Sequence, residues 1–407
     1  MLISHIHRTF KNIDSKIPIL TRSKKSSQLN HNKILLVGMA ESAHFQKWLL
    51  AVQEEFQDRK ILIFPSDRPR LTRTKLNALK QGKGSTRIFK LIPNSKLNFV
   101  FYYLLDNLFG IRWRAYFLAR FIIFHKPAIN HFHEMQHGAY IFNLIVNYRK
   151  IPNNSLNIIS TWGSDLTLYS WADKHQVQIK SCLNWTNILT AEKEVEIEDA
   201  KRLGYNREFR APIYITIGET FSNKIEFIKP SSRKLILIKG HQSDTGLALN
   251  ALFIISQIKN YLKDFEIIVY SAPECVQIQV DFLRNKDKIN IKTIAKVSNN
   301  QMRNYFERTR VAISLAVSDG LPGVLVEAMQ SGAFPIQSAN SAADKLISHG
   351  QNGFIVNPWD FNLIRESLLK AITDDSLVDR AYEQNKKVLQ REYNYNIGVS
   401  RMRELYL

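Results

Sequence analysis

Two acidic residues, Asp319 and Glu327, stand eight positions apart in the stretch S-D-G-L-P-G-V-L-V-E-A-M-Q-S-G-A-F-P-I-Q, residues 318–337. Apolar residues at i, i+3, i+4, i+7 and i+8 predict one helical face, made of Leu321, Val324, Leu325, Ala328 and Met329. Gly332 and Pro335 then supply signals that end the helix. At about 100° per residue, Glu327 lies roughly 120° from the centre of the apolar face. We therefore expect Glu327 to face a cleft or water.

The same stretch contains the features of an anion site. The apolar run at residues 309–317 predicts a buried strand, so the acidic loop joins a strand to a helix at the carboxyl end of a sheet, where open α/β sheets bind ligands. Pro322 suits the first helical position, and the free N–H groups around Gly323 and Val324 suit a diphosphate. Carboxylates repel phosphate, but they accept hydrogen bonds from sugar and ribose hydroxyls.

Three histidines occupy a predicted strand-to-helix junction at residues 128–138, A-I-N-H-F-H-E-M-Q-H-G. His131 and His133 alternate along the strand and therefore share one face. Apart from Glu134, no acid or cysteine cluster lies nearby in the sequence, so we predict no metal site and keep one as the alternative interpretation. For His131 we expect a buried, hydrogen-bonded side chain.

The pattern S-D-G-x-P-x-x-L-V-E-A-M-x-x-G resembles the E-x7-E signature of the retaining nucleotide-sugar glycosyltransferases of family 4, with Asp319 in place of the usual Glu. The resemblance implies an α/β protein with the GT-B fold. That fold has two facing Rossmann-like domains, a central cleft, and a C-terminal helix that crosses back to the first domain. The alternative is that Glu327 belongs to the solvated face of a packing helix.

The resemblance also implies roles for individual residues. Glu327 is expected to hold the ribose hydroxyls of the donor, Asp319 the sugar hydroxyls, and His133 to orient the transferred sugar, with His137 as the alternate. The loop T-W-G-S-D at residues 161–165 is similar to a loop of the family, in which Asp165 caps the next helix or lies near the acceptor.

The donor diphosphate is expected to lie between the two domains. Gly38 matches the family glycine that lets the diphosphate approach the first strand. Family members carry an Arg and a Lys in the first turn of the second domain, whereas here Lys239 ends the predicted strand and His241 and Leu247 occupy places where a cation is expected. Lys239 is the best candidate cation, with His241 assisting when protonated. The predicted donor-binding residues are Gly38, Lys239, His241, Leu321, Gly323, Val324 and Glu327.

The implied reaction moves a sugar from a nucleotide-sugar, UDP- or GDP-linked, to a glycan or lipid-linked acceptor. It retains the configuration and needs no metal and no other cofactor. Cell-surface polysaccharide or lipopolysaccharide synthesis is the expected setting. The alternatives are a nucleotide-sugar-binding protein with weak or no transferase activity, and a GT-B sugar-nucleotide epimerase or hydrolase.

With 407 residues, the chain is long enough for two domains. We predict a basic, disordered or loosely packed leader at 1–32 and a Rossmann-like acceptor domain at 33–228. A Rossmann-like donor domain follows at 229–388, and a helix at 389–407 returns to the first domain. The boundary is placed where an irregular segment at 211–230 ends in Pro230.

The net charge of +20 is concentrated at one end of the chain. Residues 1–126 hold 23 Lys and Arg against 7 Asp and Glu, a net +16. Such a field favours anionic partners: a membrane surface, a polyanionic glycan or nucleic acid. No RNA or DNA module is recognisable, and the aromatic residues cluster in apolar runs, so we predict no nucleic acid partner.

Residues 97–124 alternate apolar runs with charges and predict one or two amphipathic helices, packed in the core or lying at a membrane interface. No apolar run is long enough to span a bilayer, and no signal peptide is apparent. With only Cys182 and Cys275 there is no disulfide framework, which indicates a reducing compartment. We predict a cytoplasmic protein attached peripherally to the inner face of the cell membrane.

Overall fold

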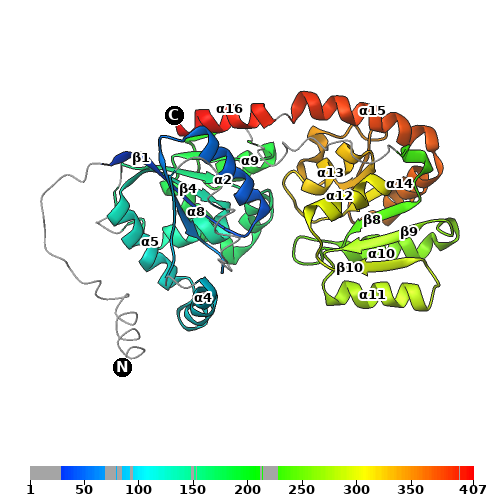
Figure 1. Cartoon of the computed structure of the whole chain (residues 1–407), viewed down its shortest axis with the longest axis horizontal. Helices are drawn as coiled ribbons and strands as arrows, with labels where there is room; N and C mark the ends of the chain where they lie inside the picture. The colour runs from blue at the N-terminus through cyan, green and yellow to red at the C-terminus, as the bar shows by residue number, and fades with distance from the viewer. Residues whose placement is uncertain are drawn as a thin grey trace, which may run out of the picture.

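The computed structural model describes residues 29–68, 79, 85–91, 95–147, 151–152, 154–210, 213, 228–393 and 395–407. Within these residues the chain forms two parallel β-sheets, each covered by helices (Figure 1). Most of the predicted leader lies outside the described residues, as do five of the basic positions that follow the second strand: Arg70, Arg73, Lys75, Lys80 and Lys83.

The first sheet contains seven strands in the order β3-β2-β1-β4-β5-β6-β7. Its strands are β1 (Asn30–Gly38), β2 (Lys60–Pro65), β3 (Ser85–Ile88), β4 (Pro127–His133), β5 (Leu156–Ser160), β6 (Ile188–Thr190) and β7 (Glu208–Arg210). The central strands are apolar runs because helices cover both faces of a parallel sheet. The edge strands β3 and β7 have exposed residues and no such run, which is why the apolar pattern did not predict them.

Helices connect consecutive parallel strands of the first sheet, as crossover connections require. The longer ones are α2 (Ala43–Glu55), α5 (Arg112–His125), α8 (Asp173–Trp185) and α9 (Glu194–Arg202). Each face of the sheet carries its own buried cluster, one with α5 and α8, the other with α2. The core therefore holds the strand ends, and with them His131 and His133, in fixed positions.

The second sheet has six strands in the order β10-β9-β8-β11-β12-β13. They are β8 (Leu235–Lys239), β9 (Glu266–Tyr270), β10 (Ile291–Ile294), β11 (Thr309–Ser314), β12 (Phe334–Ser338) and β13 (Phe354–Val356). The helices are α10 (Ala248–Gln257), α11 (Glu274–Asn285), α12 (Asn299–Arg308), α13 (Gly323–Ser331), α14 (Phe361–Thr373) and α15 (Asp375–Glu392). Both sheets thus have the doubly wound topology that was predicted.

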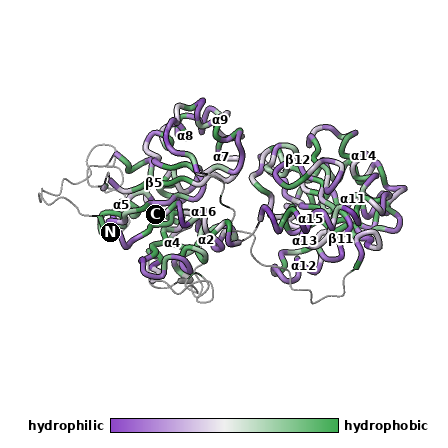
Figure 2. The backbone as a smooth tube through the Cα atoms, turned by 90° about the horizontal axis from the view of Figure 1, so that it is seen from above, coloured by the Kyte–Doolittle hydropathy of each residue, from purple (hydrophilic) through white to green (hydrophobic). Residues whose placement is uncertain are grey.

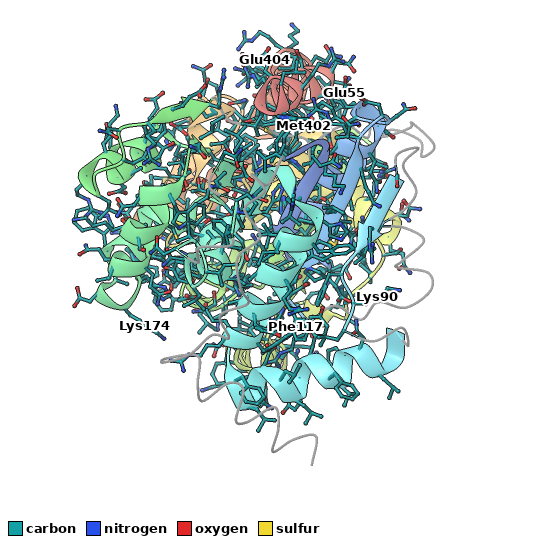
Figure 3. The ribbon with its side chains drawn as sticks, turned by 90° about the vertical axis from the view of Figure 1, so that its left-hand side faces the viewer. Glu55, Lys90, Phe117, Lys174, Met402 and Glu404 are labelled. Carbon is teal, nitrogen blue, oxygen red and sulfur yellow. The ribbon has the colours of Figure 1, made fainter. Side chains whose placement is uncertain are left out.

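The last helix, α16 (Tyr395–Tyr406), packs on the first domain, as predicted (Figures 1 and 3). Its final residue, Tyr406, is buried, and its hydroxyl accepts a hydrogen bond from Trp48 Nε1 at 2.9 Å and contacts His131 Nδ1 at 2.5 Å. Exposed contacts reinforce the docking, among them Arg403 with Glu55 at 2.5 Å. The end of α16 therefore packs against His131 and supports the pair of strand histidines.

The predicted amphipathic segment forms two helices with different environments. Helix α5 is a core helix whose Trp113, Leu118 and Ile122 are fully buried. Helix α4 (Ser95–Phe109) instead turns an apolar stripe to solvent, where Leu97, Val100, Phe101, Leu104 and Leu108 are 45–63% exposed. Interpretation as ordinary core helices is therefore correct for α5 and wrong for α4. No helix of the described residues is long and apolar enough to cross a bilayer.

Candidate functional site

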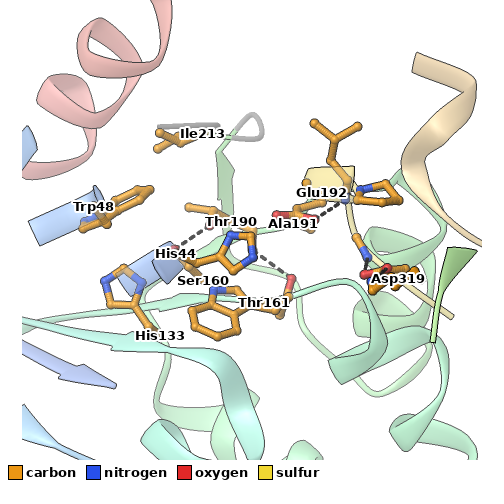
Figure 4. Close-up of a pocket in the computed structure, with 16 residues that line it drawn as sticks. His44, Trp48, His133, Ser160, Thr161, Thr190, Ala191, Glu192, Ile213 and Asp319 are labelled. Carbon is orange, nitrogen blue, oxygen red and sulfur yellow. Dashed lines mark hydrogen bonds and ion pairs between the residues drawn. The ribbon is translucent and has the colours of Figure 1, made fainter. Parts of the chain in front are cut away.

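The order of the strands reverses between β1 and β4 in the first sheet and between β8 and β11 in the second, and ligands bind at such points. His133 ends β4, Lys239 ends β8, and Asp319 follows β11. The two domains lie side by side as two lobes (Figure 2). These three residues meet in a cavity of about 210 Å³ whose wall comes from both domains (Figure 4).

Helix α13 and the loop before it follow the sequence prediction closely. The side chains of Leu325, Ala328 and Met329 are fully buried, and Gly332 ends the helix in the left-handed conformation with φ 82°. Pro322 precedes the first helical residue, one position earlier than predicted. The Gly323 and Val324 N–H groups lie in the first turn, where a helix leaves its N–H groups without helical partners.

Asp319 and Lys239 form an ion pair across the switch point of the second sheet. Lys239 Nζ lies 3.4 Å from Asp319 Oδ2, while Asp319 Oδ1 accepts the Gly320 N–H at 2.9 Å. Each side chain of the pair is 31% exposed, so the pair is reached by solvent and contributes about 1 kcal/mol or less. Both groups are therefore available to a ligand with an anionic part and hydroxyls.

Glu327 is exposed, as its position on the helix predicted. It is not part of the cavity wall, which α13 reaches with Gly323, but it lies in the field of three cations, of which Lys239 lines the cavity: Lys47 of α2, Lys239 and Arg303 of α12. Partial loss of hydration next to the surrounding protein raises the pKa of this carboxyl, and the three cations oppose that rise. Glu327 thus offers hydrogen-bond acceptors next to the cleft without a strong ion pair.

His133 is buried at the end of β4 and lines the cavity. Its ring packs edge-on against Phe45 and Trp48 of α2, with centroids 5.2 and 5.1 Å apart. Burial lowers the pKa of His133 to about 3, so the ring is neutral at physiological pH. Within the described residues, Nε2 has no hydrogen-bond partner. A neutral imidazole with an unused nitrogen in a cleft wall is suited to bind a substrate hydroxyl.

His131 is the buried, hydrogen-bonded histidine that was predicted. Its Nδ1 contacts the Tyr406 hydroxyl and its Nε2 contacts Ser160 Oγ at 2.7 Å. The two strand histidines share a face, with ring centroids 4.2 Å apart. Since both nitrogens of His131 are occupied, this residue supports the site through packing.

Two further residues of the histidine and W-G-S-D segments lie outside the cavity wall. His137 pairs with Glu134, with Nδ1 2.7 Å from Oε1, so the alternate histidine does not reach the cleft wall. Asp165 accepts the N–H groups of Trp162 and Met135 at 3.0 and 3.1 Å, and burial raises its pKa to about 8. Asp165 therefore ties the loop after β5 to the segment after β4 and holds Trp162 in the cavity wall.

The structure does not bring every predicted donor-binding residue into the cavity wall. Gly38 lies behind it, and a β-carbon there would stand 2.6 Å from the ring of Phe45 and 3.0 Å from Cβ of His133. The absence of a side chain at Gly38 thus allows Phe45 and His133 to pack at this point. The side chain of Val324 is buried in the core, although its N–H group remains in the first turn of α13.

The expected cations in the turn after β8 are absent from the cleft wall. His241 is exposed and contacts Ser243 Oγ at 2.9 Å, and burial together with nearby Lys239 lowers its pKa. A neutral His241 does not supply a charge at physiological pH. Leu247 is 6% exposed and packs in the core of the second domain, so the side chain at this position does not line the cavity.

The cavity wall also contains residues that were not predicted as part of the site, among them two titratable ones, Glu192 and His44. Glu192, after β6, reaches the second domain, where Oε2 accepts the Leu321 N–H at 2.7 Å. His44, at the start of α2, lies 5.7 Å from the ring of Trp162 and close enough to Asp319 to be influenced by its charge. Both follow the carboxyl end of a predicted strand, and that position was the signal that could have identified them.

Two facing, doubly wound parallel sheets and a returning C-terminal helix define the GT-B fold. Residues 277–388 match the family model of the glycosyl transferases group 1. No curated protein matches the sequence. The match covers the part of the chain from α11 to α15, which includes Asp319, Glu327 and α13.

Several solved structures are similar over most of the chain. HepE from Anabaena in complex with UDP-glucose aligns with TM-score 0.67 and 12% identity, covering 92% of this chain and 98% of that chain. A TarM mutant from S. aureus, in complex with fondaparinux, alpha-GlcNAc-glycerol and UDP, aligns with TM-score 0.66 and 11% identity, over 92% and 99%. An alpha,alpha-trehalose 6-phosphate synthase from Burkholderia multivorans aligns with TM-score 0.66 and 12% identity, over 92% and 98%. At these identities the likeness concerns the fold.

Proposed function

We propose that this protein is a glycosyltransferase that moves a sugar from a nucleotide-sugar to a glycan or lipid-linked acceptor, with retention of configuration. The observation that carries the proposal is the arrangement around the cavity. Lys239 and Asp319, with Glu327 beside them, face neutral His133 of the other domain at two opposed switch points. This arrangement combines a cation, two carboxyls and a neutral hydrogen-bonding ring, which suits a diphosphate attached to sugars.

The donor binds mainly to the second domain in this proposal. Its diphosphate lies near Lys239 and the first-turn N–H groups of α13, where the helix dipole favours negative charge. The transferred sugar places its hydroxyls against Asp319 and His133, and the ribose is held by Glu327. The donor is expected to be UDP- or GDP-linked, and the uridine nucleotides named with HepE and TarM favour UDP.

The reaction forms a bond between an acceptor hydroxyl oxygen and the anomeric carbon of the sugar, and it breaks the bond from that carbon to the diphosphate. The leaving diphosphate takes the bonding electrons and the proton of the hydroxyl. Attack from the same face as departure retains the configuration. Lys239 and the α13 N-terminus stabilise the charge that develops on the diphosphate, and we propose that they do so without a metal or other cofactor.

The test of this function compares two carboxyl variants of the second domain. A panel of nucleotide-sugars is added to the pure protein, and we expect one of them to raise the melting temperature. Turnover of that donor with membrane extract should fall sharply in Glu327→Ala and persist in Glu366→Ala, which changes an exposed glutamate of α14. Full activity of Glu327→Ala would overturn the assignment of the donor site.

We also propose that the first domain attaches the enzyme to an anionic membrane, at the inner face of the cell membrane. The exposed apolar stripe of α4 is suited to the acyl boundary, and Figure 3 shows α4 at the edge of the domain with side chains pointing outward. Exposed Arg112 and Arg120 of the adjacent α5 add positive charge. A lipid-linked acceptor for surface polysaccharide or lipopolysaccharide synthesis fits such a location.

Vesicle sedimentation tests the membrane proposal. The protein should bind vesicles that contain anionic lipid more at low salt than at high salt, since salt screens the charges. Leu104→Glu should reduce binding strongly, because it places a charge in the centre of the α4 stripe. Val177→Glu changes an exposed residue of α8 in the same domain; this variant is the control and should bind as the unchanged protein does. Equal binding by both variants would contradict the role of α4.

A second candidate function is a nucleotide-sugar-binding protein with weak or no transferase activity. It is favoured by the turn after β8, where Leu247 is buried and the pKa of His241 is lowered, so that Lys239 is the cation of this turn that faces the cavity. Tight binding of a donor without turnover on any acceptor would support it. Conversion of the donor without an acceptor would instead indicate an epimerase or hydrolase.

A further inference from the structure

Three consecutive residues after β6 reach from the first domain to the second. Glu192 Oε2 accepts the Leu321 N–H at 2.7 Å, Lys193 Nζ donates to the carbonyl oxygen of residue 340 at 3.2 Å, and Glu194 pairs with Lys345 at 3.2 Å. Of the three, Glu192 lines the cavity, whereas the other two lie in a neighbouring depression. The segment therefore joins the domains directly beside the donor site.

The contact of Glu192 is closely fitted. A β-carbon on Gly320 would lie 1.7 Å from Glu192 Oε2, so this approach requires glycine at position 320. Gly163 approaches the same loop from another side, and a β-carbon on Gly163 would stand 2.0 Å from the Gly320 nitrogen. Loops of the first domain thus cover the Asp319–Leu321 turn on two sides.

The position of Glu192 is fixed from within its own domain. Glu196, in the first turn of α9, accepts the N–H groups of Glu192 and Lys193 at 2.8 and 3.0 Å. A loop that is held in this way presents its side chain at little further cost in conformational entropy. Burial and the charges of the nearby acids Glu196 and Asp319 together raise the pKa of the Glu192 carboxyl to about 8.

Leu321 is one of the predicted donor-binding residues, and its N–H group lies two residues before α13, whose first turn holds the donor diphosphate in the function proposed above. A carboxyl oxygen, a phosphate oxygen and a sugar hydroxyl are all acceptors for such an N–H group, and one N–H cannot serve two of them fully. The acid of the first domain therefore stands where an oxygen of the donor is expected.

We propose that Glu192 competes with the nucleotide-sugar donor for the Leu321 N–H, so that the donor-free protein is held closed by Glu192 and the donor must displace it. This inference rests on the proposed function and assigns to Glu192 a role in setting donor affinity. A donor that binds only those molecules in which Glu192 has left shows an apparent dissociation constant equal to its intrinsic constant divided by the fraction of such molecules. Removal of Glu192 should remove this penalty.

The experiment measures the dissociation constant of the stabilising nucleotide-sugar by calorimetry in the full chain and three variants. Glu192→Ala should bind the donor about two- to tenfold more tightly, the range expected for one hydrogen bond. Glu192→Gln keeps an acceptor oxygen and should bind like the unchanged protein. Glu194→Ala removes an ion pair across the same interface, with an 85% exposed carboxylate, and should also leave the affinity unchanged.

A second measurement does not depend on the donor. In the donor-free protein, hydrogen exchange of the peptide that contains residues 318–322 should be faster in Glu192→Ala than in the unchanged protein or in Glu194→Ala. Equal exchange, or weaker donor binding by Glu192→Ala, would overturn the inference and leave the proposed function standing. Faster exchange with no nucleotide-sugar bound by any variant would overturn the proposed function, and with it the competition.

Discussion

The carboxyl ends of the two sheets face the same cavity, but the titratable groups at the two ends differ in burial and in charge. In the first domain two polar groups at this edge, His133 and Asp165, are buried: the pKa of His133 falls to about 3 and that of Asp165 rises to about 8, both mainly through burial, so neutral forms are favoured. In the second domain Lys239 and Asp319 are each 31% exposed and remain an ion pair. Under the proposed function, the charges of the donor are therefore matched by the second domain, and the first domain offers neutral hydrogen bonds and packing.

The largest effect should follow from a change on the charged side. Asp319→Asn removes the carboxylate that pairs with Lys239 and that, in the proposed function, accepts the sugar hydroxyls. We expect kcat/KM to fall by about 100-fold, as for loss of a preorganised electrostatic group. Steady-state kinetics with the stabilising donor measure this. The control Asp281→Asn changes an exposed carboxylate of α11 and should retain activity. If Asp319→Asn were as active as this control, the proposed role of the charged pair in the second domain would be contradicted.

A change on the neutral side should be smaller and should show no titration. His133→Phe keeps the packing against Phe45 but loses the unused Nε2, and we expect kcat/KM to fall by about tenfold, near the value of one to two hydrogen bonds. Because the pKa of His133 is about 3, its protonation should not appear in the activity profile between pH 5 and 8. An inflection in that range that disappears in His133→Phe would show that the ring titrates during catalysis.

The support beneath the histidines affects stability. Tyr406→Phe removes the hydroxyl that accepts from Trp48 and contacts His131, and leaving buried partners unsatisfied costs about 1–3 kcal/mol. Urea denaturation, followed by tryptophan fluorescence, measures the free energy of unfolding. Tyr395→Phe, which loses an exposed bond to Glu54, is the matched control and should change stability less. Equal losses would mean that the docking of α16 does not depend on this network.

The smallest effect is a pH dependence at the interface of the two domains. The pKa of Glu192 is raised from 4.5 to about 8, so the folded protein favours the protonated acid. This contribution to stability is complete below pH 4.5 and is lost as the pH rises through 8. Melting temperatures of the unchanged protein and Glu192→Gln should therefore diverge between these values, with the variant favoured at high pH. Parallel curves would contradict the burial of this carboxyl.

Much of the second domain could be predicted from local pattern. The strand, acidic loop and helix around Asp319 and Glu327 are contiguous in sequence, and apolar spacing fixed which side of α13 is buried. The return of α16 was correct because the resemblance supplied it. The boundary at residue 228 and the roles of the site residues stay predictions.

Contacts that depend on the docking of the two domains could not be predicted. Glu192 belongs to a run of acids that reads as a solvated helix start, and only tertiary structure brings it to the Leu321 N–H. The same is true of α4, whose apolar stripe predicts burial but is exposed, because the spacing of apolar residues does not say what covers them.

The claim that the charged edge of the second domain binds the donor is tested most directly by measuring where the diphosphate binds. Calorimetry with UDP and GDP should show that Lys239→Met weakens binding of the preferred diphosphate by about tenfold or more, while binding of the matching nucleoside changes little. Lys60→Met, at the opposite end of the first sheet, should bind the diphosphate as the unchanged protein does. Equal affinities for the diphosphate in Lys239→Met and Lys60→Met would contradict a donor site on the second domain.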